Sequence, residues 1–103
     1  MELNFNIHYS EDFEEDLRGI YTHVAHNLQN PFAALELVNR IISAAEALRV
    51  FPKIHRVRRK KSGREIRITI VKNFNILYSV DDEKNVVNIL RVLYGRRNID
   101  SLP

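Results

Sequence analysis

A run of basic side chains between residues 53 and 67 is the part of this sequence best equipped for chemistry. Fifteen residues carry eight Lys or Arg side chains against a single acid, Glu65. The bases are Lys53, Arg56, Arg58, Arg59, Lys60, Lys61, Arg64 and Arg67. Positive charge at this density attracts a polyanion, either a nucleic acid or an acidic protein segment. The alternative is a solvated basic hairpin, because surface strands use Lys and Arg to prevent edge pairing.

The other side chains that could act in catalysis or bind a metal do not form a known catalytic or metal-binding pattern. The chain has no Cys, which excludes disulfides, thiolate metal sites and Cys nucleophiles, and favours a reducing cytoplasm. His23 and His26 are three residues apart, but no third ligand accompanies them, so a solvated helix face is the better interpretation. The serines have no His and acid beside them, and three glycines cannot build a phosphate-binding loop. We therefore predict no metal site and no cofactor.

Length and composition predict one compact domain over residues 1–103. Hydrophobic residues make up 45% of the chain and charged residues 28%. A chain of this length buries roughly two-thirds of its unfolded surface, which suffices for a core without disulfides or metal. No stretch approaches the length of a membrane span, and the N-terminus lacks a signal pattern, so we expect a soluble cytoplasmic protein without a membrane partner. The charge is uneven, with a net −6 on residues 1–48 and +9 on residues 49–103.

Apolar periodicity predicts an N-terminal strand followed by two helices. Residues 3–9 alternate apolar and polar side chains, as in a half-buried strand. Ser10 is a suitable N-cap for a helix whose apolar side chains recur at helical spacing over residues 13–28. Asn30 followed by Pro31 begins a second helix, whose apolar stripe runs over residues 34–48. Because the connection is so short, the two helices are expected to form an antiparallel hairpin.

Alternation with a period of two returns after the helices. The predicted strands are residues 54–60, a segment with Ile66, Ile68 and Ile70 on one face and Arg67 and Thr69 on the other, residues 74–80, and residues 86–94. The last is almost entirely apolar, which is typical of a central strand. Three consecutive hairpin-linked strands and the N-terminal strand give an α+β fold of order β-α-α-β-β-β. In this fold the helical hairpin packs on a four-stranded antiparallel-type sheet.

This order of elements, together with five short segments, resembles the RelE/ParE superfamily of bacterial toxins. The segments are 16–21 (DLRGIY), 30–34 (NPFAA), 51–52 (FP), 74–80 (FNILYSV) and 90–99 (LRVLYGRRNI). The most specific is the last, an apolar strand with one Arg that ends in Gly-Arg-Arg-Asn-Ile. The resemblance spans essentially the whole chain. It implies a growth-inhibiting toxin of a plasmid stabilisation module, which a cognate antitoxin neutralises.

The resemblance implies two alternative mechanisms, of which the first is enzymatic. RelE-like members cut mRNA on the ribosome without metal, using the RNA 2′-hydroxyl as nucleophile, and therefore need a base, phosphate cations and an acid. Under this alternative, Arg67 and Arg97 are the phosphate cations and Tyr94 is the acid. The candidate bases are Glu65 and His55. For Tyr94, the other interpretation is a packing role at the end of the sheet.

ParE-like members instead inhibit DNA gyrase by binding, and the sequence favours this branch. Asn75 stands where RelE-like nucleases carry an Arg, and Ile66 and Ile68 stand where some nucleases place Lys. The ending at residues 95–99 and the long helical hairpin also resemble ParE. A third interpretation is an inactive toxin-like binding module.

We predict that cations in the second half of the chain bind the antitoxin and the target. These residues are Arg58, Arg59, Lys60, Lys61, Arg64, Arg67, Arg91, Arg96 and Arg97. A disordered antitoxin segment, rich in acids and apolar anchors, is expected to lay a helix on the helical hairpin and to pair a strand or loop with the basic region. For Arg91, the other interpretation is an ion pair with an acid of the first helix.

Overall fold

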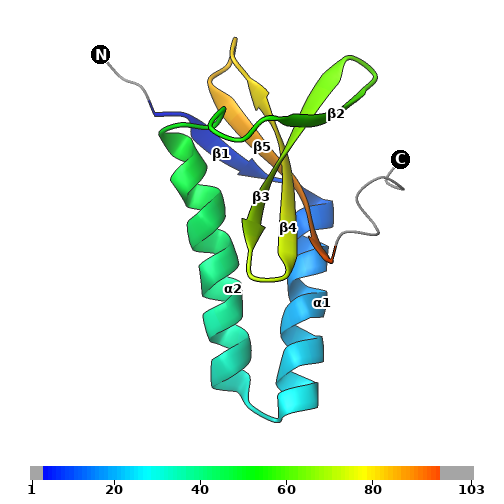
Figure 1. Cartoon of the computed structure of the whole chain (residues 1–103). Coiled ribbons are helices and arrows are strands. Elements are labelled where there is room, and N and C mark those ends of the chain that lie inside the picture. The colour runs from blue at the N-terminus through cyan, green and yellow to red at the C-terminus, as the bar shows by residue number, and fades with distance from the viewer. Residues whose placement is uncertain (1–3, 96–103) are drawn as a thin grey trace.

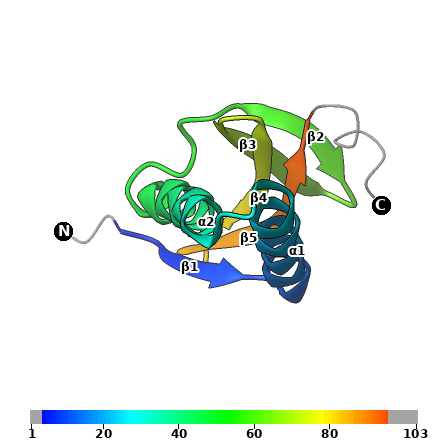
Figure 2. The same ribbon diagram turned by 90° about the horizontal axis from the view of Figure 1, so that it is seen from below.

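The structure, a computed structural model, describes residues 4–95 and contains two helices packed on one mixed sheet. The elements in chain order are β1 (Asn6–Tyr9), α1 (Glu11–Leu28), α2 (Pro31–Glu46), the short 3₁₀ helix η1 (Ala47–Arg49), β2 (Val57–Lys61), β3 (Arg64–Val71), β4 (Phe74–Asp81) and β5 (Val86–Tyr94). The two helices run antiparallel and extend beyond the sheet (Figure 1). Seen along the helices, β1 and β2 lie at opposite edges of the sheet (Figure 2). The predicted α+β fold is confirmed.

The sheet has five strands in the order β1-β5-β4-β3-β2, where the sequence predicted four. A strand segment had been predicted for each of the five, β2 among them as residues 54–60, so only the count of four was wrong. The expectation of an antiparallel-type sheet holds for β2 to β5, but β1 pairs with β5 in parallel. The helical hairpin returns the chain to the start of β1, where the Phe5 amide donates to the Arg49 carbonyl at 2.8 Å.

Both predicted helix caps are present. Ser10 Oγ accepts a hydrogen bond from the Phe13 amide at 2.9 Å and donates to the Leu90 carbonyl at 2.8 Å, so it also ties the start of α1 to β5. The Asn30 side chain accepts from the amides of residues 32 and 33 at the start of α2. The second helix ends at Glu46 rather than continuing to residue 48, because η1 tightens its last turn. No helix among residues 4–95 is long and apolar enough to cross a membrane.

The two faces of the sheet bury separate apolar clusters. The helices cover the main core, which consists of Phe13, Ile41, Ala45, Leu48, Phe74, Ile76, Tyr78, Val87, Ile89 and Val92. A smaller cluster of Ile66, Ile68 and Leu77, bordered by Leu90 and Leu93, forms on the opposite face. Since side chains alternate along a strand, the isoleucines of β3 point away from the helices, while Arg67 and Thr69 point toward them. The second face, which carries no helix, is where the candidate site lies.

A chain of hydrogen bonds joins β1 to the end of α2. The Tyr9 hydroxyl donates to Glu46 Oε2, and Arg49 Nε donates to Glu46 Oε1 at 2.7 Å. These two hydrogen bonds hold the pKa of Glu46 below its ordinary value, and the bond from Tyr9 has the larger effect. Burial of the carboxylate acts in the opposite direction. Burial, followed by the bond to Glu46, raises the pKa of Tyr9.

We expect Glu46 to stabilise the fold at neutral pH and to lose this effect in acid. Its pKa is lower in the folded than in the unfolded chain, so its contribution is complete above the ordinary pKa of 4.5 and declines as pH falls through the folded pKa. Glu46→Gln should therefore melt below wild type at neutral pH and approach it in acid, as followed by circular dichroism. Exposed Glu36→Gln is the control. A Glu46→Gln difference that stays constant with pH would contradict this role.

Candidate functional site

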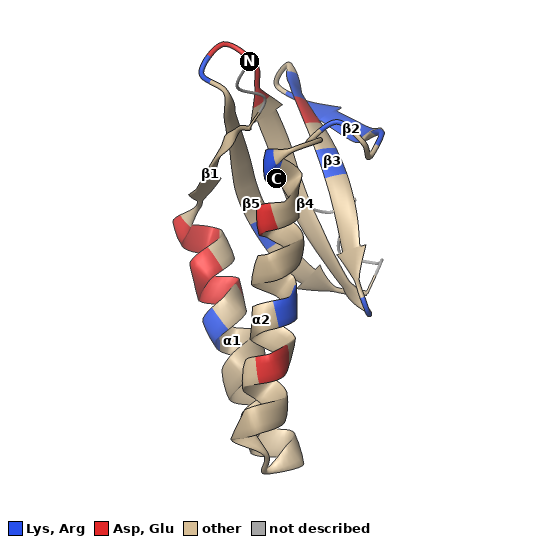
Figure 3. Ribbon diagram, turned by 90° about the vertical axis from the view of Figure 1, so that its left-hand side faces the viewer, with Lys and Arg blue, Asp and Glu red and all other residues tan. Residues whose placement is uncertain are grey.

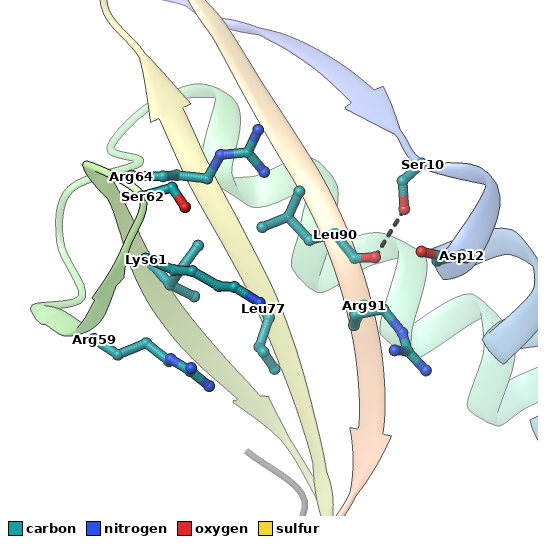
Figure 4. A pocket seen from close by; sticks show the side chains of 10 residues that line it. Ser10, Asp12, Arg59, Lys61, Ser62, Arg64, Leu77, Leu90 and Arg91 are labelled. Carbon is teal, nitrogen blue, oxygen red and sulfur yellow. Dashed lines mark hydrogen bonds between the residues drawn. The ribbon is translucent and has the colours of Figure 1, made fainter. Parts of the chain in front are cut away.

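The helix-free face of the sheet is hollowed into a cavity of about 440 Å³, called here the basic groove. Its lining residues are Ser10, Asp12, Arg59, Lys61, Ser62, Arg64, Ile66, Leu77, Leu90 and Arg91. Figure 4 shows Arg59, Lys61 and Arg64 reaching in from the β2–β3 hairpin, with Arg91 and Asp12 on the opposite side. Leu77 and Leu90 lie between these walls. The groove therefore presents cations around an apolar floor.

The β2–β3 hairpin divides the basic run between two sides. The tight turn at Ser62 and Gly63 has φ values of 52° and 79°, and beyond it Lys61 pairs with Arg64. Alternation along β2 then directs Arg59 and Lys61 into the groove, whereas Arg58 and Lys60 are not among its lining residues. The sequence had grouped these four cations as one patch.

Arg91 lies on the far wall, where Asp16 of α1 compensates its charge. Arg91 Nε and Nη2 donate to the Asp16 carboxylate at 2.7 and 2.9 Å, and the Val92 amide donates to the same carboxylate at 3.2 Å. The hydrogen bond to Asp16 is the largest cause of the raised pKa of Arg91, and burial opposes it. The ion pair with a helix acid, one of the two interpretations of Arg91, is confirmed. On the hairpin wall, by contrast, Lys61 and Arg64 form no ion pair with another of residues 4–95.

Opposite charges gather at the two ends of this region (Figure 3). The acids Glu11, Asp12 and Glu14 occupy the first turn of α1, where they favour the positive end of the helix dipole. The bases lie on β2 and the start of β3. An acidic ligand in the groove is therefore attracted to the hairpin wall and repelled from the α1 wall, which would orient it.

Arg67, predicted as a phosphate cation, lies outside the groove. Its Nη1 donates to the His55 carbonyl at 2.6 Å, and its Nη2 lies 3.7 Å from Glu65. Only 12% of the Arg67 side chain is exposed. The structure therefore brings Arg67 close to both candidate bases, although it is the backbone of His55 that Arg67 contacts.

Tyr94, predicted as the acid, is exposed at the end of β5, where its ring packs edge-on against Phe74 with centroids 5.3 Å apart. Tyr94 pairs with Phe74 on β4, whereas Arg67 pairs with Tyr78. Those partners are four residues apart, which places Arg67 and Tyr94 roughly 13 Å apart along the strands. Arg96 and Arg97 lie outside the described residues. Within residues 4–95, the predicted catalytic residues are thus not gathered at one point.

Asn75, which stands where nucleases carry an Arg, has a structural contact. It is buried, and its Nδ2 donates to the Gly95 carbonyl at 2.6 Å, which fastens the end of β5 to β4. Gly95 has a φ of 75°, a conformation that favours glycine. No three His, Asp or Glu side chains of residues 4–95 are placed to hold a metal ion.

Two side chains of the sheet fix residues 50–56, called here the pinned loop, which runs from η1 to β2. The buried Tyr78 hydroxyl donates to the Pro52 carbonyl at 2.6 Å, and Arg67 holds the carbonyl of His55. Burial raises the pKa of Tyr78 to about 12, although the charge of Arg67 acts against it. β2 therefore begins at Val57, and the prediction of a strand from residue 54 was wrong.

We expect Tyr78→Phe to destabilise the fold by about 1–3 kcal/mol, because it leaves the Pro52 carbonyl without a donor. Urea denaturation followed by circular dichroism measures the loss. Tyr21→Phe, at a partly exposed position on α1, is the matched control and should stay close to wild type. Equal urea midpoints for the two variants would show that the Tyr78 hydroxyl contributes nothing to the loop anchor.

The fold is similar to that of solved toxin–antitoxin proteins. It matches a chain of the chromosomal ParDE system from P. aeruginosa with a TM-score of 0.75 and 20% identity, covering 92% of this chain and 100% of that one. It also matches a chain of a RelBE toxin–antitoxin complex from Mycobacterium tuberculosis with a TM-score of 0.63 and 18% identity, covering 91% of this chain and 94% of that one. A chain of a RelE–RelB complex from Pyrococcus horikoshii matches with a TM-score of 0.63 and 12% identity, covering 91% of this chain and 98% of that one. These likenesses define a RelE/ParE fold.

The sequence places the chain more narrowly within that class. The family model described as ParE toxin of type II toxin-antitoxin system, parDE, matches residues 7–99. The chain therefore belongs to the ParE toxin family, as the resemblance predicted. No curated protein sequence matches it.

Proposed function

We propose that this chain is the growth-arresting toxin of a type II module and that a segment of its cognate antitoxin neutralises it by occupying the basic groove. The observation that carries the proposal is the wall of Arg59, Lys61 and Arg64 beside an apolar floor. An acidic segment with apolar anchors uses both features at once: its acids meet the hairpin cations while its apolar side chains cover the half-buried Leu90. A bare phosphate backbone would use only the cations.

We further propose that the toxin acts by binding DNA gyrase in the cytoplasm rather than by cutting RNA. Membership of the ParE family supports this mechanism. The separation of Arg67 from Tyr94, and the use of Arg67 to hold the pinned loop, favour binding over catalysis. A catalytic pair must act on one reacting phosphate, whereas Arg67 and Tyr94 lie roughly 13 Å apart along the sheet.

A ribosome-dependent ribonuclease is the second candidate, and one contact favours it. Glu65 lies 3.7 Å from the guanidinium of Arg67, so a carboxylate base and a phosphate cation are adjacent. In that mechanism Glu65 takes the proton of the 2′-hydroxyl, and its oxygen bonds to phosphorus to form a 2′,3′-cyclic phosphate while Arg67 stabilises the developing charge. The bond between phosphorus and the 5′-oxygen breaks, and the leaving 5′-oxygen takes a proton from water.

Expression of the chain in a bacterium without the antitoxin tests these mechanisms. DNA and protein synthesis are followed together by isotope incorporation, with Glu65→Gln beside wild type. We expect DNA synthesis to fall first, cells to form filaments, and Glu65→Gln to remain toxic. Prompt arrest of translation with cut mRNA, abolished by Glu65→Gln, would establish the ribonuclease instead. Normal growth with soluble protein would indicate an inactive binding module.

A further inference from the structure

The pinned loop exposes three large apolar side chains in five residues. Val50, Phe51 and Ile54 are 47%, 67% and 72% exposed. A cluster of this kind on a small domain is a frequent mark of a protein-binding surface. None of the three lines the basic groove. In Figure 1 the loop is the green segment between the end of α2 and β2.

The backbone of the pinned loop is fixed by contacts with side chains of the sheet, so the loop presents its exposed apolar side chains in an ordered arrangement. Pro52 is buried, and its carbonyl and that of His55 are bound by Tyr78 and Arg67. Lys53 Nζ reaches Asp82 at 2.6 Å, and the Ile54 amide closes a turn onto residue 51 at 3.2 Å. A surface that is already ordered avoids much of the entropy loss of binding.

The charge beside the loop is positive. Arg56 and Arg58 are exposed, and neither forms an ion pair with another of residues 4–95. Asp82, the acid that the loop contacts, is already paired with Lys53. β2 is also an edge strand of the sheet. The surface therefore combines apolar side chains with two unpaired arginines, which complements an acidic ligand that carries apolar anchors.

We propose that Val50, Phe51, Ile54, Arg56 and Arg58 form a second protein-docking surface, which takes an acidic segment with apolar anchors and is separate from the basic groove. This proposal does not depend on whether the toxin acts on gyrase or on mRNA. Because β2 directs Arg59 and Lys61 to one side and Arg58 to the other, a partner on the loop leaves the groove accessible. One toxin molecule can thus hold two partners at once.

The test is a display library of random peptides of about twelve residues, selected on the folded chain. Selected peptides are measured by fluorescence anisotropy on wild type, Phe51→Ser with Ile54→Ser, and Arg56→Glu with Arg58→Glu. The controls are Phe32→Ser, which removes an exposed aromatic at the tip of the helical hairpin, and Lys61→Glu with Arg64→Glu in the groove. All altered side chains are exposed or line a cavity, and circular dichroism checks that each variant folds.

We expect a class of peptides that combine Asp or Glu with large apolar residues and bind each loop variant roughly tenfold or more weakly than wild type. The same peptides should bind both controls as they bind wild type. The proposal is overturned if every selected peptide depends on the groove cations or if no loop-dependent peptide is acidic. It is also overturned if oligouridine RNA binds more tightly than any peptide and is lost in the loop variants, because the surface would then recognise nucleic acid.

Discussion

The triple reversal Arg59→Glu, Lys61→Glu and Arg64→Glu should weaken the binding of the cognate antitoxin by about 100-fold or more. The change converts the cationic wall of the groove into an anionic one that repels an acidic segment, and 100-fold corresponds to about 2.7 kcal/mol. The affinity of the variant should also fall less steeply with added salt, because salt then screens a repulsion from the groove wall instead of an attraction. Isothermal titration calorimetry with the purified antitoxin at several salt concentrations measures both effects.

The matched control reverses three cations of the same basic run that do not line the groove, Arg56, Arg58 and Lys60. It changes the net charge of the chain by the same amount but leaves the groove intact. We expect it to bind the antitoxin within a few-fold of wild type. An equal loss in both triple variants would show that overall charge, rather than the groove, attracts the antitoxin. An unchanged affinity and salt dependence in the groove variant would refute the placement altogether.

Asp16→Ala is expected to lower the free energy of unfolding by roughly 2–4 kcal/mol. The carboxylate accepts two hydrogen bonds from Arg91 and one from the Val92 amide, and thereby joins α1 to β5. Removing it leaves a half-buried guanidinium and a backbone amide without their acceptor. Urea denaturation followed by circular dichroism gives the loss.

Glu15→Ala, at the neighbouring exposed position of the same helix, is the control. Alanine favours the helix there, and no hydrogen bond of Glu15 with another of residues 4–95 would be lost. Asp16→Asn should be intermediate, because an amide oxygen still accepts one hydrogen bond while the charge is absent. If Asp16→Ala unfolds at the same urea concentration as Glu15→Ala, the contact between α1 and β5 does not stabilise the fold.

Local sequence signals predicted the helical part of the fold well. Ser10 and Asn30 cap their helices through contacts with residues two or three positions away, and such contacts follow from the sequence alone. The start of β2 was mispredicted because Ile54 and Val57 suggested an extended segment. Two distant side chains, Tyr78 and Arg67, instead hold this part as a loop.

The candidate site could be predicted only in part, for a similar reason. The density of charge in residues 53–67 identified the basic region, but its division depended on where β2 begins, since a shift of one residue exchanges the two faces. The irregularity between Val57 and Arg59 adds to that dependence. For Arg91 the sequence left two interpretations, and the choice required the contact with Asp16, which is 75 residues away. The pinned loop, with its exposed Phe51, was not predicted as a surface at all.

The measurement that tests the central claim most directly is the supercoiling of relaxed plasmid by purified gyrase, titrated with this chain in the presence and absence of its antitoxin. We predict that the toxin stops supercoiling, that the antitoxin restores it, and that the antitoxin fails to restore it when the toxin carries the triple groove reversal and still inhibits. Supercoiling that is unaffected by folded toxin at any concentration would contradict the gyrase mechanism. Restoration by the antitoxin of gyrase inhibited by the groove variant would contradict neutralisation through the groove.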